Sequence, residues 1–434
     1  MPPPRAFALS PLEQRVLAAV DEAALVRDLG DLVAIPSLDG EETAAQERGA
    51  ELMAAYGLAV DRWWIDLDGL RRHPSYSCEV ERREALGVVG VAGETRGGRD
   101  IIFNAHIDVV PPGDATRWTH GPWCGGVHGG CVYGRGALDD KGGVVCSIHA
   151  ARALTVAGAR LKGRVLVESV VGEEDGGTGT LGAILRGHTA DGAVVVEPTE
   201  LMIIPAQAGA LNFRVTVQGR SAHGCVRDQG VSAFEKFLPL HEALLELERV
   251  RNERARAQDE AAARPLYEAY RLLIPLSVGT VEAGDWPSSV PERLVCQGRY
   301  GIGVGEALSE ARVEFEDAVA RAAAADPWLR EHPPVVEWWG GQFASAQTSL
   351  DAPVVEALAW AAEHLTGAAP RVEGATYGAD MRLLVNDGCI PSVLFGPGDV
   401  RLAHGPDERV PVRELAQAAR ILALTALRFC GHND

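Results

Sequence analysis

The chain has 434 residues, of which 47% are hydrophobic and 23% are charged, so it is long enough for two globular domains with buried cores. Acidic residues outnumber basic residues by 60 to 41, which gives a formal net charge of −19. Because so acidic a surface repels nucleic-acid phosphate and anionic lipid, we expect neither nucleic acid nor a membrane as a partner.

Neither the amino terminus nor the cysteines indicate secretion. The apolar stretch Ala6–Leu9 is too short for a signal peptide, and no window approaches the ~20 apolar residues of a transmembrane helix. The eight cysteines include no C-x-x-C pair and are too sparse for a disulfide scaffold. We therefore expect free thiols and a cytoplasmic location.

Helical and strand patterns alternate along the first half of the chain. Apolar residues at helical spacing predict helices over 12–34, 41–56 and 143–157. Short apolar runs, typical of buried parallel strands, occupy 88–91, 101–103, 165–171 and 193–196. This alternation predicts an α/β fold in which helices flank both faces of a sheet.

The pattern changes near residue 205 and changes back near residue 326. Strands at 211–219, 274–280 and 294–300 and helices at 231–270 and 306–325 form the intervening stretch. The first pattern then resumes with a strand at 335–338, a helix at 351–366, a strand at 392–395 and a helix at 412–429. We therefore expect a larger α/β domain, residues 1–205 and 326–434, interrupted by an inserted α+β domain, residues 206–325.

Histidine and acidic side chains follow the ends of the predicted strands. The strand at 101–103 leads into His106 and Asp108, which would share one face and lie where open α/β sheets bind ligands. A histidine beside a carboxylate suits a metal ligand held by a hydrogen-bonding partner, although a surface turn has the same pattern. Glycines around Asp139 and Asp140 would bring two adjacent acids into a confined turn, where a cation would neutralise them.

Three further segments add chemistry of the same kind. The strand at 165–171 delivers Glu173, Glu174 and Asp175, which would repel one another without a counter-charge. Another strand delivers Glu197, and His404 follows a Gly/Pro-rich loop. Two histidines and three carboxylates suit a dinuclear site for Zn²⁺, Co²⁺ or Mn²⁺ with one bridging carboxylate. The expected ligands are His106, Asp139, Glu174, Glu197 and His404.

The motifs HIDVVPPGD, GRGALDDKGG, EEDGGTGT, VEPT, GRSAHG and AHGPDE together resemble those of the M20 metallopeptidases. That family includes acetylornithine deacetylase, succinyl-diaminopimelate desuccinylase, aminoacylase and bacterial carboxypeptidases. The resemblance covers nearly the whole chain and includes the insertion. It implies a zinc exopeptidase-like catalytic domain with a mixed sheet, and an inserted lid and dimerisation domain.

The resemblance also distributes the ligands between two metal ions, with Zn²⁺ the first expectation. It implies that His106, Asp139 and Glu197 hold one ion, and that Asp139, Glu174 and His404 hold the other. Asp139 would bridge the two ions, and a cis peptide would follow it.

Other roles follow from the same resemblance. Asp108 would orient His106, and Glu173 would be the general base. His223 would reach across a homodimer interface to stabilise the oxyanion in the partner's active site, with a loop histidine as the alternative. Arg299 would bind a substrate carboxylate, with a surface arginine as the alternative.

The substrate pocket departs from the family pattern. Ser289 stands where many relatives have asparagine, and Gln297 replaces the usual acidic residue. Asp380 and Arg382 are further substrate-binding candidates, and a buried structural ion pair explains them equally well. The polar loop 71–84 has no assigned role.

The favoured function is a two-metal amidohydrolase that removes an acyl group from a small N-acyl amino acid or related amine, because Glu197 is the choice of the deacetylase and desuccinylase branch. A dipeptidase or carboxypeptidase would use the same metal site. The segments GATYGADMRLL and GPGDVRLAHGPDE also resemble deformylases of aminopyrimidines. A catalytically inactive binding protein would have lost a ligand or the base. A nucleotide-binding protein is disfavoured, because G-x-G-x-x-G after a strand and the P-loop are both missing.

Overall fold

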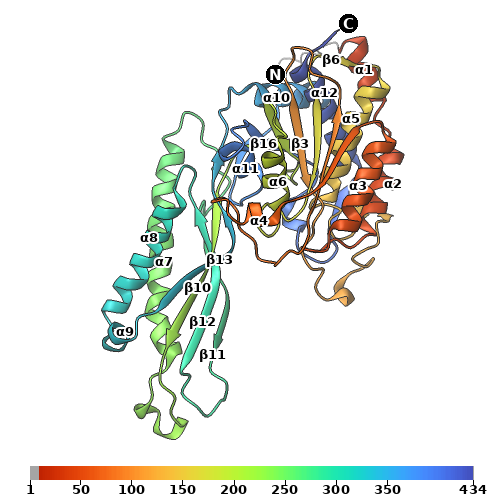
Figure 1. The fold of residues 1–434 in the computed structure, drawn as a ribbon. Helices are drawn as coiled ribbons and strands as arrows, with labels where there is room; N and C mark the ends of the chain where they lie inside the picture. The colour runs from red at the N-terminus through yellow and green to blue at the C-terminus, as the bar shows by residue number, and fades with distance from the viewer. Residues whose placement is uncertain (1–8, 434) are drawn as a thin grey trace. The chain divides into compact units, whose positions relative to one another are not determined.

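The computed structural model describes residues 9–433, which form two compact units (Figure 1). The first unit contains the described residues up to Ala206 together with Gln347–Glu373 and those from Ala379 onward. The second contains Gln207–Ala346 and Gly374–Gly378.

The first unit is built on one long mixed sheet. Its strands lie in the order β1 (Ala59–Trp64), β2 (Leu86–Ala92), β7 (Val165–Val170), β3 (Ile101–His106), β8 (Gly192–Val195), β16 (Ser392–Leu394), β9 (Ile203–Gln207) and β14 (Ala346–Gln347), and β15 (Val372–Ala375) pairs with β9. The four strands β7, β3, β8 and β16 are parallel neighbours, and every residue in them is buried. Full burial explains why these strands are mostly apolar in the sequence.

Helices cover both faces of this sheet. One face packs against α3 (Thr43–Ala55), α5 (Lys141–Val156), α10 (Pro353–Thr366) and α12 (Val412–Cys430), with α1 (Pro11–Ala18) and α2 (Glu22–Val33) outside them. The other face carries α6 (Thr178–Arg186) and α11 (Met381–Asn386), with α4 (Leu67–Leu70) beside α6 (Figure 1). Apolar residues from both layers and the sheet form one core. The predicted α/β fold is confirmed.

Two details of the sequence prediction were wrong. The helix expected over 12–34 is two helices, because the Asp21 carboxylate accepts a hydrogen bond from the Ala24 N–H at 3.1 Å and begins α2 anew. The run at 88–91 lies in β2, which is antiparallel to β7. Burial by helices on both faces makes a strand apolar whichever way it runs, so the run could not reveal its direction.

Two small sheets complete the first unit. The first joins β4 (Val127–His128), β5 (Cys131–Tyr133) and β17 (Arg409–Pro411), and the second joins β6 (Arg160–Leu161) to β18 (His432–Asn433). The pairing of β17 with β5 fixes the segment after His404 beside the turn that carries Asp139.

The second unit is a four-stranded antiparallel sheet against two long helices (Figure 1). The strand order is β11 (Leu276–Ala283), β12 (Arg293–Ile302), β10 (Gly209–Gln218) and β13 (Val335–Phe343). The helices are α7 (Ala233–Glu260), α8 (Leu308–Ala324) and the short α9 (Pro327–Glu331). Because β13 pairs with β10, the chain remains in this unit beyond residue 325, where the sequence predicts its end.

The sequence also predicts free cysteines and no transmembrane helix. All eight cysteines lie within the described residues and are free thiols, as expected. No helix within residues 9–433 is sufficiently long and apolar to cross a membrane.

Candidate active site

His106 is the last residue of β3 and is buried. Its Nδ1 lies 3.0 Å from the backbone oxygen of Asp108 and 3.7 Å from the Asp108 carboxylate. Because Nδ1 is occupied by this carbonyl, Nε2, which lies 2.9 Å from Asp139 Oδ1, is the nitrogen that would bind a metal ion after losing its proton. The ring is therefore oriented as a metal ligand would be.

Asp139 follows a tight glycine-rich turn and precedes a cis peptide bond to Asp140. Gly136 in this turn has φ +82°, and a Cβ there would lie 2.6 Å from a Val109 methyl group, so a larger residue does not fit. Asp140 accepts a hydrogen bond from the Gly143 N–H at 3.0 Å and caps α5. The turn thus fixes Asp139 against His106.

Glu408 holds this turn from the other side. Its fully buried carboxylate accepts backbone N–H groups of Gly136, Leu138 and Asp139 at 2.8, 3.1 and 3.2 Å, and it also pairs with Arg135. The sequence pattern alone does not reveal this role of Glu408. The signal lay in the AHGPDE motif, but its partners are more than 260 positions away in the chain.

The turn after β7 supplies two adjacent glutamates. The Glu174 N–H donates to Asp108 Oδ2 at 3.0 Å, so Asp108 contacts both His106 and this turn. Glu174 Oε1 lies 3.0 Å from His404 Nε2, and the same nitrogen is 3.4 Å from Asp139 Oδ2. The structure therefore brings together residues from four separate segments.

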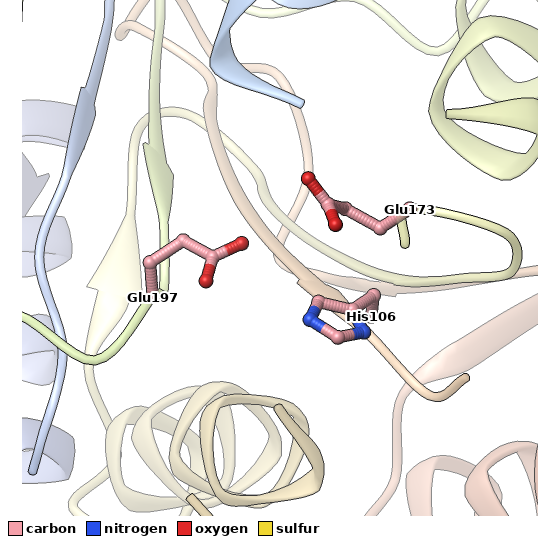
Figure 2. A group of neighbouring side chains, drawn as sticks. All are labelled: His106, Glu173 and Glu197. Atoms are coloured by element: carbon pink, nitrogen blue, oxygen red, sulfur yellow. The ribbon is translucent and has the colours of Figure 1, made fainter. Parts of the chain in front are cut away.

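Two groups of side chains in the described residues have ligand atoms close enough to share a metal ion, all within 4.8 Å of one another. One contains His106, Glu173 and Glu197, and Figure 2 shows the two carboxylates reaching toward each other beside the imidazole ring. The other contains His106, Asp139 and Glu174. Glu173, expected as the base, thus lies among the expected ligands. Imidazole and carboxylate donors suit Zn²⁺ and similar divalent ions.

The electrostatics indicate an excess of negative charge. Burial and the charges of Glu197 and Asp380 raise the pKa of Glu173 well above its ordinary value, and burial and Asp139 raise the pKa of Glu174. Burial and nearby carboxylates raise the pKa of Glu197 to about 8. Mutual repulsion of this kind is relieved when a divalent cation binds.

The same negative charge favours the protonated form of both histidines. Hydrogen bonds to Asp139 and Glu174 raise the pKa of His404 to about 10. Burial lowers the pKa of His106, but Asp108 and Asp139 outweigh it and raise that pKa well above its ordinary value. Burial would raise the pKa of Asp139, yet its bonds to both histidines lower it.

Asp380 and Arg382 are buried at the start of α11 in the same unit. Arg382 Nη2 donates to the Gly176 carbonyl at 2.8 Å, just beyond the glutamate turn. Asp380 raises the pKa of Glu173, so both side chains act on the surroundings of that glutamate.

The remaining predicted site residues belong to the second unit. His223 is exposed and pairs with Ser289 through a backbone bridge, and its Nδ1 accepts a hydrogen bond from the Cys225 N–H at 3.1 Å. Arg299 is half-buried and donates to the Thr376 carbonyl at 3.2 Å. Burial lowers the pKa of Arg299, and its side chain has no carboxylate partner among the described residues.

Known proteins resemble this chain in sequence. A family model for peptidase family M20/M25/M40 matches residues 102–428. An N-formyl-4-amino-5-aminomethyl-2-methylpyrimidine deformylase of Halalkalibacterium halodurans is 29% identical over 350 residues, which are 76% of this chain and 79% of that protein. The protein of that name in Bacillus subtilis is 27% identical over the same shares of the two chains.

Solved structures share the fold. Human carnosine dipeptidase 1 has a TM-score of 0.74 at 16% identity, over 98% of this chain and 100% of that one. An M20 family metallo-carboxypeptidase of Sulfolobus solfataricus has a TM-score of 0.73 at 15% identity, over 94% and 99%. With a family model covering most of its length, and with clustered residues that can hold metal ions, this chain belongs to peptidase family M20/M25/M40 and is a metal-dependent hydrolase of amide bonds.

Proposed function

We propose that this protein is a two-metal amidohydrolase that removes a formyl group from a small N-formylated amine. The observation that carries the metal chemistry is the clustering of carboxylates around His106, because the two clusters together contain four of the five proposed ligands, His106, Asp139, Glu174 and Glu197. The observation that favours the formyl group is the name shared by the two deformylases, which match about three quarters of the chain.

In this proposal His106, Asp139 and Glu197 hold one divalent ion, and Asp139, Glu174 and His404 hold the other. Zn²⁺ fits these donors best, and Co²⁺ or Mn²⁺ would also be accepted. When bound, a metal pair lowers the pKa of a bridging water so that hydroxide is present near neutral pH. Asp108 keeps the His106 ring in place through its carbonyl oxygen.

Glu173 is the proposed general base. Its carboxylate lies beside His106 and Glu197, and its pKa is raised by burial and by neighbouring negative charge. A carboxylate in this position can take the proton of the attacking water and then deliver it to the leaving amine.

His223 is the proposed oxyanion stabiliser, acting across a homodimer. It is exposed in the second unit and belongs to a GRSAHG segment. An imidazole N–H aimed at the developing oxyanion would lower the barrier to attack.

Arg299 favours a second candidate, the deacylation of N-acyl amino acids. A half-buried guanidinium with no carboxylate partner among the described residues can bind a substrate carboxylate through two parallel hydrogen bonds. Ser289, Asp380 and Arg382 remain proposed as pocket residues in either case. An inactive binding protein is the poorest fit, because all five ligands and Glu173 are present.

The test is hydrolysis by purified protein with and without Zn²⁺, Co²⁺ or Mn²⁺. The substrates are a formylaminopyrimidine, N-acetylornithine, N-succinyl-diaminopimelate, other N-acyl amino acids and several dipeptides. We expect metal-dependent release of formate from the first. Turnover confined to the carboxylate-bearing substrates would favour the second candidate, and turnover of dipeptides alone would make the protein a peptidase. If the protein hydrolyses none of these substrates and binds no metal, the proposal is contradicted.

A further inference from the structure

The loop 71–84, which the sequence leaves without a role, buries one arginine beside the turn that carries Glu173 and Glu174. The side chain of Arg82 is 0% exposed and lies among three carboxylates. Its Nη2 is 3.1 Å from Asp39 and 3.2 Å from Asp175, and its Nη1 pairs with Glu42. A single guanidinium therefore joins three acidic side chains.

Those carboxylates come from two separate segments of the chain. Asp175 directly follows Glu173 and Glu174 in the turn after β7, and its second oxygen accepts the Val80 N–H at 3.2 Å. The loop therefore binds the two oxygens of Asp175 at two different points.

Asp39 and Glu42 belong to the segment between α2 and α3. This segment is hydrogen-bonded to the residues that follow His106: the Ser37 hydroxyl donates to the Ile107 carbonyl at 2.7 Å, and the Val109 N–H donates to the Ser37 carbonyl at 2.9 Å. Arg82 thus links the glutamate turn to the support of the His106–Asp108 strand end.

The guanidinium also touches the base of the glutamate turn. Gly172, the residue before Glu173, has φ +68°, and a Cβ there would lie 2.6 Å from Arg82 Nη2. The turn is therefore closed against the guanidinium without space for a side chain.

Charge explains why an arginine is needed. Burial, together with Asp108 and Asp175, raises the pKa of Asp39 to about 9, so negative charge is in excess around Arg82 as well. Removing the one cation from such a cluster leaves uncompensated buried carboxylates. The planar fork of arginine can serve three carboxylates at once, whereas a lysine offers a single point charge.

We propose that Arg82 is a positioning residue for the metal site. It holds the turn of Glu173, Glu174 and Asp175 in the position in which Glu174 contacts His404. This inference rests on the proposed roles of Glu173 and Glu174. It predicts that loss of Arg82 lowers the affinity for the metal ion held by Glu174 and His404 more than the affinity for the ion held by His106 and Glu197.

The experiment compares Arg82→Ala and Arg82→Lys with Arg83→Ala, which changes the exposed neighbour in the same loop. Metal-free protein is titrated with Zn²⁺ by calorimetry and with Co²⁺ by visible absorption. We expect Arg82→Ala to weaken one of the two binding steps by about 10- to 100-fold, as loss of groups that support metal ligands commonly does. We expect kcat to fall with little change in KM, Arg82→Lys to recover part of both losses, and Arg83→Ala to match the wild type.

The outcomes separate this inference from the function on which it rests. If the wild-type protein binds two ions and the Arg82→Ala variant has the same two affinities and the same kcat, the inference alone is overturned. Equal weakening of both steps also overturns it, because it indicates a general loss of structure. Wild-type protein that binds no metal overturns the proposed function and the inference together. If Arg82→Ala does not fold, Asp175→Asn breaks the link from the other end, and unchanged metal binding in that variant overturns the inference.

Discussion

Glu173 and Glu408 are both buried carboxylates of the first unit, but their oxygens have different surroundings. Both oxygens of Glu408 are bound, one by three backbone N–H groups and the other by Arg135. Oε1 of Glu173 has no hydrogen-bond partner among the described residues. A carboxylate with a free oxygen beside metal ligands can exchange a proton with water, whereas a saturated one supports the backbone.

The first prediction concerns Glu173. Glu173→Gln removes the proton acceptor but keeps the size of the side chain, so kcat should fall by about 10²- to 10⁴-fold while two metal ions still bind. Steady-state kinetics and metal analysis of the same preparation measure both effects. Undiminished kcat would show that another group takes the proton.

The second prediction concerns Glu408. Glu408→Ala leaves the buried Arg135 and three N–H groups without their acceptor, so the free energy of unfolding should fall by about 3–5 kcal/mol. Urea unfolding of the metal-free protein measures this change. Glu363→Ala is the control, because that side chain is exposed on α10, and it should stay within about 0.5 kcal/mol of the wild type. Equal stabilities in the two variants would contradict the role of Glu408.

At the scale of elements, the sequence predicted what depends on burial and missed what depends on distant partners. The strands β3, β7 and β8 are fully buried and mostly apolar, so their positions and the acidic residues after their ends could be identified. The edge strand β1 has an exposed and mixed pattern, and it went unrecognised. The contacts of Arg82 join it to Asp39 and Asp175, 43 and 93 positions away, and no local periodicity reveals such a link.

The third prediction concerns the contact between α2 and α5. His149 Nε2 on α5 lies 2.9 Å from Asp28 Oδ2 on α2, and Tyr56 donates to the same oxygen at 2.5 Å. Burial lowers the pKa of His149 despite Asp28, so its stabilising contribution is complete above the pKa of the unfolded state and is lost as pH falls below it.

His149→Gln keeps a side chain able to bond Asp28 but cannot titrate. The free energy of unfolding of the wild type should therefore fall more steeply than that of the variant between about pH 7.5 and about pH 5.5. Urea unfolding of both proteins at the two pH values measures this difference. Identical slopes would show that His149 titrates alike in the folded and unfolded states.

At the scale of the whole molecule, the proposed dimer makes a prediction that a monomer cannot satisfy. If His223 serves the partner's active site, His223→Ala and Glu173→Gln should each be nearly inactive, yet a mixed dimer has one site with an intact Glu173 and an intact His223. Equal mixing after subunit exchange should restore about a quarter of wild-type activity. Activity that does not rise on mixing, in chains shown to exchange, would place His223 outside the partner's site.

The main stretch of the inserted unit begins and ends at neighbouring strands of the long sheet. The chain leaves through β9 and returns through β14, and these strands are neighbours, with the Thr348 N–H bonded to the Pro205 carbonyl at 2.8 Å. The two ends of the insertion are therefore adjacent in one sheet. The proposed carboxylate receptor Arg299 and oxyanion donor His223 belong to the second unit, whereas His106, Glu173 and Glu197 belong to the first, so substitutions that alter substrate recognition need not alter the strands that carry the hydrolytic chemistry.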